Sequence, residues 1–176
     1  VIARTDGEGN TTTFAYHPGG QIRTVTAPDG AKLYQAEYDV WGRPDSETDG
    51  NGNTTVYEKD RWGHVTKVTL PDGGIEKYHY DACGRLRELI TGEQKTSYGY
   101  DKAGRLAEVC ASNGIRAQYR YDRNDMQTEV LYGNGLRTSY TYDERSQLTG
   151  MESVLKDGRI LHKASYSYDN AGNRIT

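Results

Sequence analysis

The chain has little of the material from which ordinary globular domains are built. Apolar residues make up 34% of its 176 positions, against roughly 45–50% in a typical soluble domain, so a deep hydrophobic core is not expected. No apolar run approaches the roughly 20 residues of a membrane-spanning helix. No segment carries a 3.6-residue apolar period over three turns, so almost no helix is expected.

Charge of one sign is not concentrated anywhere. The 22 basic residues are interleaved with 25 acidic ones, giving a net charge of −3. Proteins that bind nucleic acid usually carry a basic patch or stripe, so no nucleic-acid partner is expected. The chain does not open with the n-region and h-region of a signal peptide. It begins in the middle of its sequence pattern, and we expect it to be a fragment whose export signal lies elsewhere.

Cysteine is too scarce for a disulfide framework. The two cysteines are Cys83, in a predicted turn, and Cys110, in a predicted strand. The favoured interpretation is two free thiols, and a bridge between neighbouring repeats is the alternative.

Motifs for catalysis and metal binding are also missing. There is no Gly-x-Ser-x-Gly elbow, phosphate loop or dinucleotide fingerprint, and no histidine lies in a metal-ligand spacing. The histidines are His17, His64, His79 and His162. Segments 6–10 and 49–53 faintly resemble the start of a calcium-binding loop. The sixth position of such a loop needs Gly, but counting from Asp6 and Asp49 it is Thr11 and Thr54. We expect turns there, no cofactor, no metal and no enzyme, with His162 as the one weak catalytic candidate.

Tyrosine and glycine, by contrast, are abundant, with 15 and 21 copies. The dipeptide Tyr-Asp begins at Tyr38, Tyr80, Tyr100, Tyr121, Tyr142 and Tyr168, with degenerate copies at Tyr16-His17 and Lys59-Asp60. The steps between these starts are 22, 21, 21, 20, 21, 21 and 26 residues. A nearly constant period indicates one supersecondary unit copied along the chain.

The unit itself predicts a β-hairpin, most clearly over residues 77–90. Residues of different character alternate before Asp81 and again after Gly84, and this two-residue alternation indicates two strands. The Asp-x-x-Gly segment indicates a type I turn closed by a glycine in the left-handed conformation. Asp81 should face Arg85, and Tyr80 should face Leu86. One face then carries Tyr78, Tyr80 and Leu86, and the other carries His79, Asp81, Arg85 and Arg87.

Two copies have lost the turn glycine. Asp125-Met126-Gln127 replaces Gly-Arg-Leu, so that turn is expected to have drifted, and Ser146 replaces the glycine of the next copy. A second, Gly-containing turn separates the units at their other end, as in Pro71-Asp72-Gly73 and Asn134-Gly135. The sequence thus predicts an all-β fold. It is an array of about eight antiparallel β-hairpins in a curled strip over residues 1–176, with units starting near 16, 38, 59, 80, 100, 121, 142 and 168.

This pattern resembles the YD repeat, also called the Rhs repeat, which reads Tyr-Asp-x-x-Gly-Arg-Leu followed by a Gly-containing turn. Segments 80–86 and 100–106 match every fixed position, and segments 38–43 and 168–172 match in part. The repeat positions are Tyr38, Asp39, Gly42, Arg43, Tyr80, Asp81, Gly84, Arg85, Leu86, Tyr100, Asp101, Gly104, Arg105, Leu106, Tyr121, Asp122, Tyr142, Asp143, Tyr168, Asp169 and Gly172. The resemblance covers the chain from about Thr11 to Thr176.

The resemblance implies more than the spacing does. In the family, a strip of hairpins spirals into a large hollow β-shell. Bacterial Rhs proteins and Tc toxin B/C components enclose a C-terminal toxin in that shell, with type VI secretion a common export route for Rhs effectors. Teneurins use a related barrel in adhesion. The chain is therefore expected to be a non-catalytic section of such a shell, secreted or at the bacterial cell surface. Its expected partners are the remaining repeats and an enclosed toxin domain.

A binding module is the alternative function. Wall-associated members of the family have been linked to carbohydrate or surface binding. Tyrosine rings at two-residue spacing could stack on sugars, and the candidates are Tyr78, Tyr98, Tyr119 and Tyr140. Packing within the sheet is the competing interpretation of the same rings.

Overall fold

The computed structural model describes residues 1–175 and holds sixteen β-strands and no helix in that range. Its contacts divide the chain into two compact units, Val1–Glu93 and Gln94–Thr176. Thr176, the last residue of the expected repeat segment, lies outside the described residues. The first unit contains β1 (Ile2–Thr5), β2 (Thr11–Tyr16), β3 (Ile22–Thr26), β4 (Lys32–Tyr38), β5 (Pro44–Asp49), β6 (Thr54–Lys59), β7 (Val65–Thr69), β8 (Ile75–Tyr80) and β9 (Leu86–Thr91). The second contains β10 (Gln94–Tyr100), β11 (Leu106–Ala111), β12 (Arg116–Tyr121), β13 (Gln127–Tyr132), β14 (Arg137–Tyr142), β15 (Leu148–Val154) and β16 (Ile160–Ser165).

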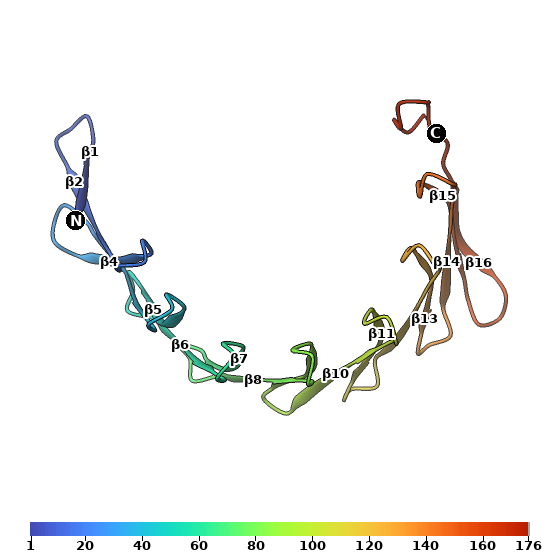
Figure 1. The fold of residues 1–176 in the computed structure, drawn as a ribbon, viewed down its shortest axis with the longest axis horizontal. Helices are drawn as coiled ribbons and strands as arrows, with labels where there is room; N and C mark the ends of the chain where they lie inside the picture. Colours follow the sequence, from blue (N-terminus) through green and yellow to red (C-terminus); the bar gives the residue numbers. More distant parts are fainter. Residues whose placement is uncertain (176) are drawn as a thin grey trace. The chain divides into compact units, whose positions relative to one another are not determined.

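Within each unit, every strand pairs antiparallel with its neighbours in sequence, so the strand order is the chain order (Figure 1). The predicted all-β fold of antiparallel hairpins is therefore confirmed. After β16, an isolated bridge between Tyr168 and Arg174 closes the last Tyr-Asp turn.

The predicted pairing is confirmed for the residues next to the turn, but one pair further from the turn a β-bulge shifts the register by one residue. Tyr80 pairs with Leu86 as expected, whereas His79 pairs with Glu88. Arg87, expected on the face of His79, is instead the extra residue of the bulge. The same one-residue shift occurs at the repeat tyrosine or its substitute in all seven hairpins from β2–β3 to β14–β15. Since a bulge bends its strand and increases the local twist, these bulges bend the sheet within each of the two units.

The predicted turn is also confirmed. The Asp81 amide donates to Arg85 O at 2.9 Å, and the Gly84 amide donates to Asp81 O at 3.0 Å. Gly84 has φ 77°, the left-handed conformation that a β-carbon disfavours. Asp81 Oδ1 accepts hydrogen bonds from the amides of Cys83 at 2.8 Å and Arg85 at 3.0 Å. The aspartate thus binds the amides of its own turn.

The expectation of a drifted turn at Asp125 is wrong. Asp125 and Ser146 adopt φ 64° and 62°, the glycine conformation, without being glycine. Their turns keep the hydrogen bonds from Asp122 N to Met126 O and from Asp143 N to Gln147 O, both 3.0 Å. The rest of the hairpin therefore dictates the backbone, and these two residues carry strain instead of changing the turn.

The core is as thin as the composition predicts. The buried apolar side chains are Ala36, Val68, Ala117 and Val130, with 1–8% exposure. Val130 pairs with Tyr119 and Val68 pairs with Tyr57, so both lie on the tyrosine-bearing face of the sheet. No large side chain among the described residues is fully buried. A sheet with no second layer packed on it depends on hydrogen bonds and half-buried rings to a degree that a two-layer domain does not.

Replacing Ser146 by glycine should stabilise the chain. Ser146→Gly removes the cost of a β-carbon at φ 62°, and we expect a gain of about 0.5–1 kcal/mol in the free energy of unfolding. Ala82→Gly is the matched control, because Ala82 lies in the equivalent kind of turn but is not among the positive-φ residues. That control should lose stability. Urea denaturation followed by circular dichroism measures both, and a loss of stability in Ser146→Gly would contradict the assignment.

Candidate functional site: the rim of interlocked turns

The Asp-x-x-Gly turns of each unit form one edge of its sheet, here called the turn rim. Consecutive hairpins separate as they approach it. The ladder between β11 and β12 runs only from the Glu108–Gln118 pair to the Cys110–Arg116 pair. Leu106, at the start of β11, therefore lies beyond this ladder and has no backbone partner on the β12 side. A carbonyl left unpaired in this way needs another donor or water.

The hydroxyl of the repeat tyrosine supplies that donor. Five repeat tyrosines reach back to the first residue of the second strand in the preceding hairpin. These bonds run from Tyr38 to Ile22 O at 2.7 Å, Tyr80 to Val65 O at 2.9 Å, Tyr121 to Leu106 O at 2.8 Å, Tyr142 to Gln127 O at 2.8 Å and Tyr168 to Leu148 O at 2.9 Å. We call this bond the tyrosine latch. Phenylalanine has no hydroxyl and cannot form it, so these five positions require tyrosine.

The degenerate copy at Lys59 keeps the connection by other means. Lys59 stands where the other units have tyrosine, and its side chain is only 8% exposed. Its Nζ forms an ion pair with Asp45 Oδ1 at 2.8 Å. Asp45 is the bulge residue of the preceding hairpin, adjacent to Pro44 at the start of β5. A lysine whose side chain is largely covered is tolerated here because it has a carboxylate partner.

The aspartates are held as carboxylates by their own turns. Hydrogen bonds from the Arg85 amide and side chain, with a further bond from the Cys83 amide, lower the pKa of Asp81 below its ordinary value of 3.8 despite partial desolvation. Arg85 Nε donates to Asp81 Oδ2 at 2.8 Å. The pKa of Asp101 is lowered in the same way, first by the Arg105 amide.

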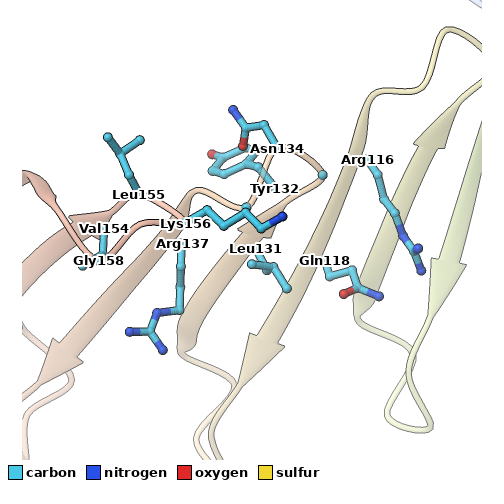
Figure 2. A pocket seen from close by; sticks show the side chains of 12 residues that line it. Arg116, Gln118, Leu131, Tyr132, Asn134, Arg137, Val154, Leu155, Lys156 and Gly158 are labelled. Atoms are coloured by element: carbon cyan, nitrogen blue, oxygen red, sulfur yellow. The ribbon is translucent and has the colours of Figure 1, made fainter.

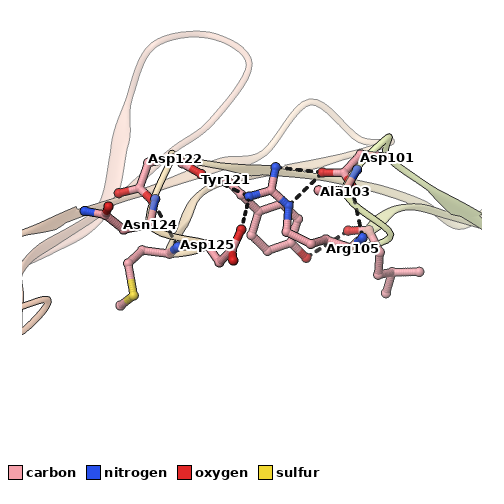
Figure 3. A network of polar contacts seen from close by, with 9 residues as sticks. Asp101, Ala103, Arg105, Tyr121, Asp122, Asn124 and Asp125 are labelled. Atoms are coloured by element: carbon pink, nitrogen blue, oxygen red, sulfur yellow. Dashed lines mark hydrogen bonds and ion pairs between the residues drawn. The ribbon is translucent and has the colours of Figure 1, made fainter.

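Arg105 extends this contact to the next turn, as Figure 3 shows. Its Nε donates to Asp101 Oδ2 at 2.8 Å, within its own hairpin. Its Nη1 donates to Asp122 O at 3.0 Å and to Asp125 Oδ1 at 2.6 Å, in the following hairpin. The guanidinium also lies 4.7 Å from the centre of the Tyr121 ring. Asp125 stands at the position of the turn glycine, and its carboxylate binds the guanidinium of Arg105 from the preceding turn.

Other units show the same contact between turns. Gln21 Nε2 donates to Gly42 O at 3.2 Å, and Gln147 Nε2 donates to Gly172 O at 3.5 Å. A β-carbon on Gly63 would lie 1.5 Å from Arg43 Nη1. In these turns, the residue after the left-handed position reaches over the glycine of the next turn, which adds a packing reason for glycine to the conformational one.

The sequence indicated the hairpin partners of these residues but not the links between hairpins. Asp81, Gly84 and Arg85 lie together in one turn, as predicted. The tyrosine latches to the preceding hairpins were missed, as was the second contact of Arg105. The constant period of about 21 residues was the available signal, because identical steps place identical side chains side by side on consecutive hairpins.

Segment 49–53, which resembles a calcium-binding loop, forms a turn, as expected. Asp49 Oδ1 accepts hydrogen bonds from the amides of Asn51 at 2.8 Å and Asn53 at 2.9 Å. Asp49 Oδ2 accepts one from Asn53 Nδ2 at 2.8 Å. Residues 1–175 contain no group of three or more His, Cys, Asp or Glu side chains placed to hold a metal ion. Cys83 and Cys110 are free thiols.

The remaining candidates are scattered. His162 is exposed on β16, where it pairs with Ser153. Each of the four proposed sugar-stacking tyrosines is half-buried opposite an apolar residue of its own hairpin. The pairs are Tyr78–Leu89, Tyr98–Val109, Tyr119–Val130 and Tyr140–Met151. In the described part of the chain, no helix is long and apolar enough to cross a membrane.

Comparisons with known proteins agree with this geometry. The family model of the teneurin YD-shell matches residues 74–152, and that of the RHS repeat matches residues 1–32. Among curated proteins, none matches the chain significantly.

Several solved structures share the fold. The TcdB2-TccC3-TEV crystal structure aligns over 99% of this chain and 10% of its own, at 17% identity and a TM-score of 0.79. TcdB2-TccC3 without its hypervariable C-terminal region aligns over 96% and 10%, at 17% identity and a TM-score of 0.75. The Photorhabdus luminescens Tc holotoxin pore aligns over 99% and 9%, at 18% identity and a TM-score of 0.53. The chain thus spans about a tenth of the proteins that it matches.

Removing one latch hydroxyl should destabilise the chain measurably. Tyr121→Phe leaves the Leu106 carbonyl without its donor at 2.8 Å, and we expect a loss of about 1 kcal/mol in the free energy of unfolding. Tyr119→Phe on the same strand is the control, since no hydroxyl partner of Tyr119 lies among residues 1–175. Urea denaturation of the two variants measures the difference. Equal effects would show that the hydroxyl contributes nothing.

Stability should also fall in acid. Because the pKa of Asp81 is lower in the folded chain than its ordinary 3.8, its contribution is complete above the unfolded pKa. That contribution is lost as the pH falls through the folded pKa. We expect a lower urea midpoint at about pH 3 than at about pH 6. Asp81→Asn should show a smaller difference between the two pH values than the parent chain, and an identical difference would refute the role of this carboxylate.

Proposed function

We propose that this chain, which consists of repeats of the YD/Rhs type, forms a non-catalytic section of the wall of a larger hollow β-shell. The observation that carries the proposal is the series of tyrosine latches, which join consecutive hairpins within each unit without a second layer. Such a strip can be lengthened by adding units, because each new hairpin needs contact only with its neighbour. Enclosure of a volume requires further repeats, since the chain spans about a tenth of the similar toxin structures.

The enclosed partner is proposed to be a C-terminal toxin domain. The full repeat region would hold that domain until delivery, by type VI secretion or by a route like that of the Tc toxins. Support comes from the likeness in fold to TcdB2-TccC3, of which one solved form lacks the hypervariable C-terminal region. The protein would then be secreted or presented at the bacterial surface, and residues 1–176 would be one uninterrupted part of a longer repeat region.

Carbohydrate or cell-surface binding is the second candidate, and one observation favours it. Trp41 and Trp62 occupy the same position in adjacent turns, with exposures of 74% and 68%. Adjacent turns are two strands apart, which is roughly 9–10 Å where the strands are paired and more at the rim, where the hairpins separate. Exposed aromatic rings at a regular spacing suit stacking on sugar rings better than the half-buried Tyr78, Tyr98, Tyr119 and Tyr140 do.

Protease protection tests the proposed wall. In the full-length protein, the domain that follows the repeats should resist a protease that cuts the same domain rapidly when it is expressed alone. Tyr121→Phe and Tyr142→Phe together should make the enclosed domain easier to cut, because two latches of the wall are lost. Equal rates for the enclosed and the isolated domain would exclude enclosure. A glycan array then tests the second candidate, with Trp41→Ser and Trp62→Ser as the variants expected to lose binding.

A further inference from the structure

A groove lies at the opposite edge of the second unit, away from the turn rim (Figure 2). Its volume is about 660 Å³. We call it the basic groove. Its floor is formed by face residues of β12–β15, and its border is formed by the turns that join β13 to β14 and β15 to β16. The lining includes Arg116, Gln118, Leu131, Arg137, Val154 and Lys156.

Two of the three cations in the groove have no internal partner. Arg116 binds Glu108 Oε1, which also accepts from Gln118 Nε2 at 3.0 Å, so the charge of Arg116 is neutralised. Arg137 and Lys156 form no ion pair among the described residues. An unpaired arginine and an unpaired lysine in one groove provide a local positive site on a chain whose net charge is −3.

The two cations stand beside apolar surface. Arg137 lies in the sheet between Leu131 on β13 and Val154 on β15, which are its partners in the two ladders. Lys156 crosses the β13–β14 turn, because a β-carbon on Gly135 would lie 2.8 Å from Lys156 Cβ. Gly135 therefore leaves room for the lysine stem to lie against the turn, which keeps Lys156 at the border of the groove.

We propose that the basic groove binds an extended polypeptide segment that carries both acidic and apolar side chains. Carboxylates would form charge-assisted hydrogen bonds with Arg137 and Lys156. Apolar side chains of the same segment would cover Leu131 and Val154, in the way that peptide grooves combine apolar contact with a few polar anchors. With Arg116 neutralised by Glu108, two cations are left to bind an external anion, which is too few for the row of phosphate contacts that nucleic acid makes. The inference does not depend on the shell function, because it uses only residues of the second unit.

Fluorescence anisotropy with a fluorescein-labelled peptide of alternating leucine and glutamate tests the inference on the whole chain. We expect saturable binding that weakens as salt is raised. The variant Arg137→Gln with Lys156→Gln should bind about tenfold or more weakly, since it loses two charge-assisted contacts. The matched control is Lys102→Gln with Arg123→Gln, which removes two exposed cations from the turn rim of the same unit. That control should bind like the parent chain.

Three results would overturn the proposal. The first is equal binding of a peptide with glutamine in place of glutamate. The second is an equal loss of affinity in the control variant, which would indicate a general charge effect. The third is preferential binding of a single-stranded oligonucleotide that the Arg137 and Lys156 substitutions abolish. Circular dichroism and urea midpoints matching the parent chain establish that a loss of binding does not come from unfolding.

Discussion

The structure depends on one constraint, which is that a sheet without a second layer must hold its own hairpins together. Within a hairpin the two strands are joined by many residue pairs, for example five in β12–β13 and six in β14–β15. Between hairpins, the ladders β3–β4, β5–β6, β7–β8, β11–β12 and β13–β14 have three pairs each, and they stop short of the turn rim. The tyrosine hydroxyl closes that gap by a bond to a carbonyl that the ladder leaves unpaired. Four buried apolar residues could not supply the same cohesion by packing alone.

The exceptions to the repeat show which parts of it are physically required. Lys59 replaces the tyrosine but still reaches the preceding hairpin through Asp45. Asp125 replaces the turn glycine but keeps the backbone conformation and binds Arg105. In both cases the identity of the residue changes while the link between hairpins is preserved. We infer that the link, more than any single residue of the motif, is what a unit must provide to its neighbour.

The sequence predicted what is local to a hairpin and missed what joins hairpins. Two-residue alternation and the Asp-x-x-Gly spacing were sufficient for the strands, the turn and the Tyr80–Leu86 pair. The bulge at Arg87 was not predicted. The alternation of side chains along one strand does not show at which residue that strand has one residue more than its partner. The drifted turn expected at Asp125 was wrong, because loss of glycine was equated with loss of the turn. The basic groove was not foreseen, since Arg137 follows one turn and Lys156 lies within the next, and the sequence does not show that Lys156 crosses the first of these turns.

Native-state amide hydrogen exchange on the Tyr142→Phe protein tests the central claim most directly. The Tyr142 hydroxyl belongs to the β14–β15 hairpin and its acceptor, Gln127 O, to the β12–β13 hairpin. If the latch joins hairpins, exchange should accelerate in both of them, while β10 and β11 keep the protection that they have in the parent chain. An acceleration confined to β14–β15, or none at all, would contradict the account.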